Sequence, residues 1–488
     1  MTRTFNTRLV VKTMGALLII EAVFMLLPTL ASWLYGEPDF RVFRLSTCLT
    51  FSAGLLAMLI GRRADKHVGE REGYLIVALV WFVFSLFGML PYYLSGAAGS
   101  FTDAFFETMS GFTTTGFTIL PDVEAMTHGV LLWRALTQWL GGLGIIVLCI
   151  AILPMFGLGG MQLYAAEVTG VSYEKLSPRI ADTAKRMWGL YVLLTASETL
   201  LLWLFGMEGF DALCHSLSTI ATGGFSTRNL SLMEYSPAIQ YTVGVFMLLS
   251  GINFALLIYT LMRKPEKLLH DEETHWYLGA VAVFTVFISV GLFLSQRNFT
   301  PSGAEEAFRH GFFMVTAAIT STGYAVTDYM NWHVVLWVVL FFLMFTGASS
   351  GSTSGGLKWV RLAIIFKNGQ AEFKRRIHPN AIIPVKLNGK PVPVQTLNNV
   401  VAFMIIYVMV ILVTVVAFCA CGIDFDEAIG TTVSAIGNVG ISIGSYGPMG
   451  TYADFPMLAK WLMTLVMLIG RLEIFTVLLL FSPALWRK

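Results

Sequence analysis

The sequence predicts an all-α polytopic membrane protein: four pseudo-symmetric helix–loop–helix repeats plus two extra N-terminal transmembrane helices. Two observations predict this fold class. Apolar residues make up 56% of the 488-residue chain and charged residues only 13%, whereas a soluble domain carries roughly 25% charged residues. In addition, four short breaks in the apolar pattern share one spacing of acidic, small polar and glycine residues. A net charge of +2 gives no indication of nucleic-acid binding.

Ten apolar segments approach or exceed the roughly 20 residues that a membrane-spanning helix needs. The run after Lys12 has no small-residue cleavage site, so it is interpreted as an uncleaved first span. Four shorter apolar stretches suit half-membrane re-entrant helices. The ten predicted spans are 12–34, 42–61, 73–96, 128–157, 186–206, 236–262, 276–296, 333–364, 396–421 and 455–482.

After the first two spans, the chain repeats one order of span, half-helix, loop and span, with a period of about 100–115 residues. Such a period indicates internal repeats. The predicted divisions are a two-helix extension at 1–66, followed by repeats at 67–175, 176–270, 271–395 and 396–488.

Basic residues indicate the orientation. With a cytoplasmic N-terminus, most lysines and arginines of the loops fall on the inner face, as the positive-inside rule requires. The C-terminus is then also cytoplasmic, and all four loops approach from the outside. The longest inner segment, 365–395, is basic, and Asn388-Gly389 predicts a small hairpin in it. This segment is either a docking surface or a solvated linker.

Each half-helix is expected to begin near an acidic residue and to end near a glycine. Asp103, Asp211 and Glu427 precede Gly116, Gly224 and Gly440 by thirteen positions, whereas in the third repeat Glu305 and Glu306 lie one helical turn further upstream of Gly323. We expect Asp103, Asp211 and Glu427 to cap their half-helices, because a helix N-terminus favours negative charge.

Non-helical backbone at membrane depth survives only inside protein or beside water, so four equivalent loops imply one shared, water-accessible centre. Four half-helix C-termini pointing at that centre would favour a cation. Glycine lets carbonyl groups turn inward, where they can replace the hydration shell of an ion. Uncharged ligands suit a monovalent cation, potassium before sodium or calcium. The pattern therefore predicts helix–pore loop–helix repeats around one pore.

The predicted potassium-binding residues are the small polar and glycine residues at the end of each half-helix. Glycine and threonine also serve helix packing in membranes, but four matched sets favour a common site. No strand precedes residues 437–440, so a nucleotide loop is rejected and no organic cofactor is expected in this chain. The predicted ligands are Thr113, Thr114, Thr115, Gly116, Ala221, Thr222, Gly223, Gly224, Thr320, Ser321, Thr322, Gly323, Gly437, Asn438, Val439 and Gly440.

The four loop signatures, Thr-Thr-Gly-Phe, Thr-Gly-Gly-Phe, Thr-Gly-Tyr and Asn-Val-Gly-Ile, resemble those of the TrkH/TrkG/KtrB/HKT superfamily of potassium transporters. The resemblance covers essentially the whole chain, and the two extra N-terminal spans resemble bacterial TrkH proteins more than KtrB. The resemblance implies a homodimer with one pore in each protomer, a cytosolic ring of nucleotide-binding TrkA-like subunits and a bacterial inner (plasma) membrane. Departures from a Thr-Val-Gly-Tyr-Gly filter imply modest selectivity.

Residues 346–356 interrupt a predicted span with glycines and hydroxyl residues that cannot hold a strong helix. An exposed linker is the alternative, but apolar residues flank the stretch on both sides, which favours an intramembrane loop. The stretch resembles the gating loop of TrkH and KtrB proteins, and its small side chains could block a path and move aside. The predicted gate residues in it are Gly347, Ser349, Ser350, Gly351, Ser352, Thr353, Ser354, Gly355 and Gly356.

Arg471 lies deep in the last predicted span. An arginine at mid-bilayer costs roughly 2.5–3.5 kcal/mol on insertion scales, so its side chain is expected to face the protein interior. Pairing with Glu473 on the same helix is disfavoured, because residues two apart do not face each other. The stretch 470–473 resembles an arginine motif at the pore constriction of the superfamily, which implies an electrostatic barrier acting with the gate.

Other membrane-depth polar residues, Glu21, Gln138, Glu198 and Asn253, are interpreted as interhelical hydrogen-bonding groups rather than ion ligands. The sequence offers no nucleophile–base arrangement, so we do not expect an enzyme. The predicted function is potassium uptake through a selective, gated, channel-like pore. Three alternatives remain open: a sodium- or proton-coupled potassium symporter, the potassium-binding subunit of an ATP-driven pump, and a polytopic scaffold or sensor with a vestigial pore.

Overall fold

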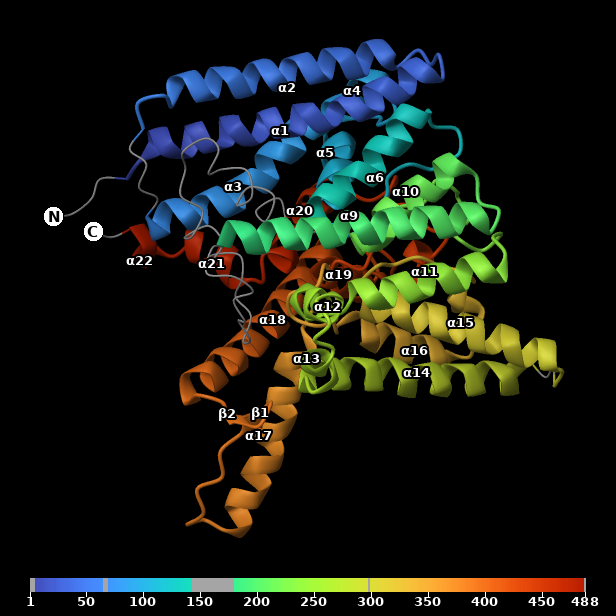
Figure 1. The fold of residues 1–488 in the computed structure, drawn as a ribbon, viewed down its shortest axis with the longest axis vertical. Coiled ribbons are helices and arrows are strands. Elements are labelled where there is room, and N and C mark those ends of the chain that lie inside the picture. Colours follow the sequence, from blue (N-terminus) through green and yellow to red (C-terminus); the bar gives the residue numbers. More distant parts are fainter. Residues whose placement is uncertain (1–4, 65–68, 143–179, 297–298, 487–488) are drawn as a thin grey trace.

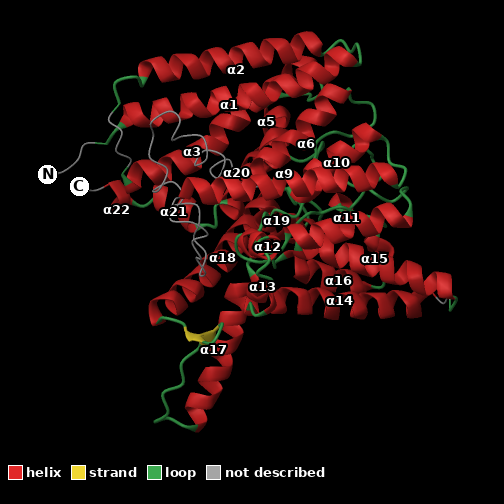
Figure 2. Cartoon of the chain, viewed as in Figure 1, coloured by secondary structure: helices red, strands yellow, loops and turns green. Residues whose placement is uncertain are grey.

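The structure is a computed structural model that describes residues 5–64, 69–142, 180–296 and 299–486. The described chain is mostly helical, and a single short hairpin supplies its strands (Figures 1 and 2). Helices suit this apolar sequence because hydrocarbon offers no hydrogen bonds, so backbone groups must bond within the chain.

Six described helices are long and apolar enough to cross a membrane, or seven if one bent pair counts as a span. They coincide with six predicted spans. They are α1 (Thr7–Leu34), α2 (Phe40–Ile60), α3 (Glu70–Gly88) with α4 (Leu90–Ser95), α9 (Ile180–Leu204), α14 (Glu272–Gln296) and α18 (Val394–Ala420). The part of the predicted span 128–157 beyond residue 142, and the predicted boundary at 175, lie outside the described residues.

The predicted continuous spans 236–262 and 455–482 are wrong, because each breaks into two helices. α11 (Pro237–Ser250) and α12 (Phe254–Leu261) meet at an angle of 101°. The side chain of Asn253 accepts a hydrogen bond from Ala255 N and so caps the new helix. α20 (Met457–Arg471) ends before two residues in the left-handed region, and α21 (Phe475–Leu480) then begins. α22 (Pro483–Trp486) follows.

Four shorter helices run into the middle of the bundle. They are α5 (Phe101–Phe112), α10 (Gly209–Ile220), α15 (Pro301–Ile319) and α19 (Phe425–Gly437). Each packs between two flanking helices of its own segment: α3 and α6 (His128–Gly142), α9 and α11, α14 and α16 (Val334–Met344), and α18 and α20.

Contacts between segments close into a ring in chain order, because α6 touches α10, α11 touches α15, α16 touches α19, and α20 returns to α5. The four short helices are therefore held around one common centre.

The two N-terminal helices lie along one edge of the bundle (Figure 1). α1 packs on α3 and α6, and α2 packs on α1 and α4. The loop between α1 and α2 binds the start of α6, where Glu37 Oε1 lies 2.7 Å from His128 Nδ1. The extension is therefore attached to the rest of the bundle rather than separate from it.

The predicted inner segment 365–395 projects from the bundle (Figure 1). Its first part continues α17 (Trp359–Ile377), so the span predicted to end at 364 extends 13 residues further as helix. The predicted hairpin is confirmed: β1 (Lys386–Leu387) and β2 (Lys390–Pro391) are antiparallel, and φ is 49° at Asn388 and 72° at Gly389. Positive φ at both turn residues is what a tight two-residue hairpin requires. The short helices α13 (Glu266–Leu269), η2 (Tyr329–Asn331) and η3 (Gly444–Tyr446) complete the described elements.

Candidate functional site

The four central helices end in loops with the same backbone conformation. One residue in each loop, two positions before the predicted glycine, lies in the left-handed region: Thr114, Thr222, Ser321 and Asn438, with φ of 52°, 55°, 53° and 52°. The N–H of the next residue then bonds to the carbonyl five positions back, at 2.9 Å in all four loops: Thr115 to Ser110, Gly223 to Ser218, Thr322 to Ala317 and Val439 to Ser434. This bond is the Schellman closure of a helix C-terminus.

The four glycines lie against one another's loops. All have positive φ: 88° at Gly116, 80° at Gly224, 75° at Gly323 and 89° at Gly440. A Cβ added at any of them would lie inside 3.0 Å of a carbonyl oxygen of the next loop. In chain order, these oxygens belong to Gly223, Thr322, Val439 and Thr115. The four loops thus form a closed ring, and the backbone passes too close for any side chain at these positions.

The ring brings together four peptide oxygens from equivalent positions, each on the residue before a ring glycine. Its threonine hydroxyls are largely engaged within the loops. Thr113 Oγ1 bonds to Met109 O at 2.7 Å and lies 2.8 Å from Thr115 Oγ1, and Thr320 makes the same pair of bonds to Thr316 and Thr322. Among the predicted ligands, the backbone carbonyls before the four glycines therefore make the contacts between loops, whereas these hydroxyls bond within their own loops. Ala221 and Gly437 occupy the places of Thr113 and Thr320 in the other two loops.

The acidic residues at the starts of the half-helices are not N-caps, which corrects the prediction. Asp103, Asp211 and Glu427 lie at the third helical position, and the caps are Ser100, Glu208 and Asp424, with Thr300 in the third segment. The cause is that each helix starts three residues earlier than predicted.

These three carboxylates instead hold surrounding segments. Asp103 pairs with Lys460 of α20 at 2.6 Å, and Asp211 pairs with Arg228 at 2.8 Å. Glu427 accepts a hydrogen bond from Ser445 N at 3.3 Å.

The segments after the glycines bond to one another in a collar outside the ring. Between segments one and two, Val123 N donates to Asn229 Oδ1, and between segments two and three, Leu232 N donates to Ala325 O. Between segments three and four, Tyr329 Oη donates to Ser442 O, and between segments four and one, Tyr452 N donates to Thr118 O. Asn229 also donates to Asp122, and this bond lowers the pKa of Asp122 below its ordinary value. The ring therefore has a second, hydrogen-bonded closure on this side.

Residues 345–358 form a loop between α16 and α17, directly against the ends of the central helices. Gly355 N donates to Ser321 Oγ at 2.7 Å, and a Cβ at Gly355 would lie 2.5 Å from Gly437 O. Thr353 Oγ1 donates to Ile220 O at 3.1 Å and to Ser250 O at 3.3 Å. The loop thus contacts the second, third and fourth segments beneath the ring.

The loop is mostly buried, so an exposed linker is wrong for this stretch. Gly347, Ser349, Ser350, Thr353, Ser354 and Gly355 are buried, Ser352 and Gly356 are half-buried, and Gly351 is exposed. Its base is closed by Gly347 N donating to Leu357 O at 2.8 Å.

Arg471 faces the interior and meets this loop. Its Nη1 donates to Thr353 O at 2.8 Å, and its Nη2 donates to Gly141 O and Gly142 O, both at 2.6 Å. Arg471 therefore joins the last described turn of α6, in the first segment, to the loop of the third. Glu473 binds Arg361 of α17 instead. A positive charge thus lies beneath the ring, bonded to three backbone carbonyls.

A family model described as "TrkH: Cation transport protein" matches residues 41–488. The chain belongs to the TrkH family of cation transport proteins. The resemblance drawn from the loop signatures is thereby confirmed. The "Trk system potassium uptake protein TrkH" of Halomonas elongata is 39% identical over 489 residues, covering 99% of this chain and 100% of that protein. The protein of the same name from Escherichia coli K12 is 38% identical over 485 residues, covering 99% of each.

A solved structure agrees with these relatives. The "Crystal Structure of the Potassium Transporter TrkH from Vibrio parahaemolyticus" superposes with a TM-score of 0.89 at 33% identity, covering 99% of this chain and 100% of that one. The fold is therefore that of a polytopic, mostly helical TrkH protein.

This TrkH-family chain supports its ring with a buried ion pair that sequence reasoning missed. Arg134 Nε lies 2.8 Å from Glu107 Oε1, and the side chains are 3% and 0% exposed. Arg134 Nη1 also donates to Ser226 O at 3.0 Å, and its guanidinium carbon lies 4.1 Å from the centre of the Phe225 ring. The pair thus ties the first loop to the second. The signal for this pair in the sequence is a single charged residue, Glu107 or Arg134, within each of two apolar segments.

Two amides brace individual loops. Gln138 Nε2 donates to Gly223 O at 2.7 Å, and its Oε1 accepts from Ser218 Oγ at 2.6 Å, so its predicted role as an interhelical hydrogen-bonding group is confirmed. Asn438 Nδ2 donates to Thr115 Oγ1 and to Met467 O, both at 2.9 Å. One brace therefore crosses from the first segment to the second, and the other from the fourth to the first.

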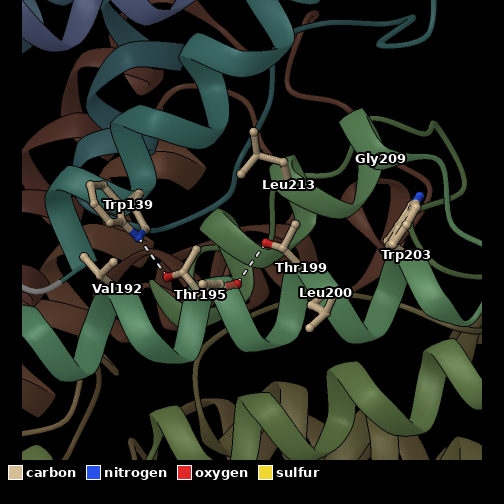
Figure 3. A pocket seen from close by; sticks show the side chains of 9 residues that line it. Trp139, Val192, Thr195, Thr199, Leu200, Trp203, Gly209 and Leu213 are labelled. Carbon is tan, nitrogen blue, oxygen red and sulfur yellow. Dashed lines mark hydrogen bonds between the residues drawn. The ribbon is translucent and has the colours of Figure 1, made fainter.

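A pocket of about 540 Å³ lies between α9, the start of α10 and Trp139 (Figure 3). Its lining is apolar apart from Thr195 and Thr199, whose hydroxyls bond to carbonyls of their own helix. The described lining therefore suits an apolar group better than a cation.

Proposed function

We propose that this TrkH-family protein carries potassium ions into the cell through a gated, channel-like pore whose selective part is the ring of four loops. The observation that carries the proposal is the cyclic contact of Gly116, Gly224, Gly323 and Gly440, each against the carbonyl of the next loop. Four peptide oxygens at equivalent positions of one ring can replace water around a dehydrated cation. The printed names of the relatives, potassium uptake proteins, support potassium as the ion.

Each of the four repeats, 67–175, 176–270, 271–395 and 396–488, contributes one quarter of this pore. The loop at 345–358 is the gate, and Arg471 is the electrostatic barrier beneath the ring. Closure is supported by the contacts of the loop with Ile220 O, Ser250 O and Ser321, and by its bond to Arg471. A cation passing the ring would meet this loop and the guanidinium.

Potassium uptake of this kind needs no coupled ion. A charge crossing 100 mV gains about 2.3 kcal/mol, which is roughly a 50-fold accumulation at about 1.4 kcal/mol per factor of ten. We further propose that the protein sits in a bacterial inner membrane with both termini in the cytoplasm and acts as a homodimer. A cytosolic, nucleotide-binding regulatory ring would meet the basic segment that follows α17.

The test is ion flux through the purified full-length protein in liposomes at clamped voltage. Potassium flux should exceed sodium flux and depend on voltage, without requiring a sodium or proton gradient. Flux that requires one of those gradients would support a coupled symporter on the same scaffold. Cation flux no greater than in empty liposomes, with the protein correctly inserted, would overturn transport by this chain alone.

A further inference from the structure

One carboxylate outside the ring holds the gating loop directly. Glu273 is the second residue of α14, and its side chain is buried. Its Oε1 accepts hydrogen bonds from Ser350 N at 2.6 Å, Ser350 Oγ at 2.9 Å and Val360 N at 3.3 Å. Two of these donors belong to the gating loop, and the third belongs to the first turn of α17.

A purely structural role, capping α17, accounts for only part of this arrangement. A capping acceptor would need only Val360 N, and that is the longest of the three bonds. The two shorter bonds go to Ser350, ten residues earlier in the loop. Because two of the three bonds come from Ser350, Glu273 holds the loop at that residue.

The described loop has charged partners on both sides. Arg471 donates to Thr353 O, and Glu273 accepts at Ser350, three residues away. Many of its other bonds are neutral, such as Ser349 N to Gly251 O at 3.0 Å. Release of the loop therefore requires breaking its bonds to one arginine and one glutamate, which lie on different helices.

The two residues before Glu273 bind the cytoplasmic hairpin and α17. Asn388, in the hairpin turn, donates from Nδ2 to Asp271 Oδ1 at 3.1 Å, and its Oδ1 accepts from Glu272 N at 2.8 Å. Lys367 of α17 pairs with Glu272 and donates to Lys386 O at 2.9 Å. Three consecutive acidic residues thus connect the projecting segment in Figure 1 to the gating loop.

We propose that Glu273 is a positioning residue that latches the gating loop in its pore-blocking position, and that the hairpin 386–391 controls this latch through the start of α14. The inference rests on the proposed function of the 345–358 loop as a gate. A displacement of the hairpin moves Asn388 and α17 relative to Asp271 and Glu272, and this movement withdraws Glu273 from Ser350.

The first experiment compares potassium flux through full-length variants in liposomes, without any cytosolic partner. Glu273→Ala is expected to raise flux about tenfold or more, since one tenfold step corresponds to about 1.4 kcal/mol and all three bonds are lost. Glu273→Gln keeps an accepting oxygen, and Ser350→Ala loses only the hydroxyl bond, so both should give smaller increases. Glu266→Ala, an exposed carboxylate on α13, is the matched control and should leave flux unchanged.

The second experiment tests the connection to the hairpin. Asn388→Ala should raise flux less than Glu273→Ala, and the double variant should not exceed Glu273→Ala, because both act on one latch. Fully multiplicative effects of the two substitutions would overturn control through the hairpin.

A readout independent of flux separates the latch from the pore. Amide hydrogen exchange of residues 348–354 should be faster in Glu273→Ala and Glu273→Gln than in the parent protein. A folded Glu273→Ala protein with parental flux and parental exchange would overturn the latch. Faster exchange in a Glu273→Ala protein that still carries no cation would support the latch and count against the proposed function.

Discussion

Replacing Gly323 by alanine tests whether the ring glycines are needed for ion passage. Gly323 has φ of 75°, and a Cβ there would lie well inside 3.0 Å of Val439 O. An L-residue in left-handed backbone costs about 1–2 kcal/mol. This cost lowers the population of the parental loop conformation, relative to its alternatives, by a factor of about 5–30. Because the clash with Val439 O adds to this cost, that range is a lower bound on the loss of potassium flux. Movement of the carbonyl should also lower the preference for potassium over sodium.

The assay is initial potassium and sodium flux into liposomes, with equal amounts of inserted protein. Gly189→Ala is the matched control, because no atom lies within 4 Å of its added Cβ and α9 is helical there. Both variants should elute from size exclusion as the parent does. Parental flux and parental ion preference in Gly323→Ala would refute the assignment of the ring as the selective element.

Three further substitutions test the surroundings of the ring. Arg471→Gln should raise basal potassium flux severalfold, because it removes the charge bonded to Thr353 O; unchanged flux would contradict an electrostatic barrier. Arg134→Ala should lower the free energy of unfolding by about 3–5 kcal/mol, since it leaves Glu107 as an unpaired buried charge. Thermal unfolding in detergent measures this, and a loss below 1 kcal/mol would argue against a fully buried pair. Gln138→Ala should lower the ratio of potassium to sodium flux and leave thermal stability largely unchanged, because it frees the Gly223 carbonyl of the second loop. An unaltered flux ratio would contradict a role of Gln138 in holding that carbonyl.

The meeting of the four loops could be anticipated because local chemistry determines their conformation. In three of the four loops, a glycine thirteen residues after a carboxylate marks both the length of the half-helix and the turn that follows it. The break in the helix at 346–356 could also be predicted, because clustered glycines and hydroxyl residues cannot continue a helix. The hairpin at Asn388-Gly389 could be predicted because both residues tolerate positive φ, and the structure confirms it.

Features that depend on tertiary partners could not be predicted from the sequence. The bend at 251–253 follows an apolar run, and the sequence predicts an interhelical group at Asn253, which instead caps the new helix. The sequence predicts a cap at Asp103, but the partner of its carboxylate, Lys460, is 357 positions away. Arg134 and Glu107 are likewise brought together only by the packing of α5 on α6. Sequence periodicity contains no information about such pairings.

Because one polypeptide supplies all four loops of the ring, each loop is encoded by its own part of the gene. A substitution next to Thr115 alters one loop, whereas in a tetramer of identical subunits it would alter four at once. Selection can therefore adjust the four loops in small, independent steps. The braces already differ in this way: an amide from a neighbouring span supports the Gly223 carbonyl, and the fourth loop carries its own amide at Asn438.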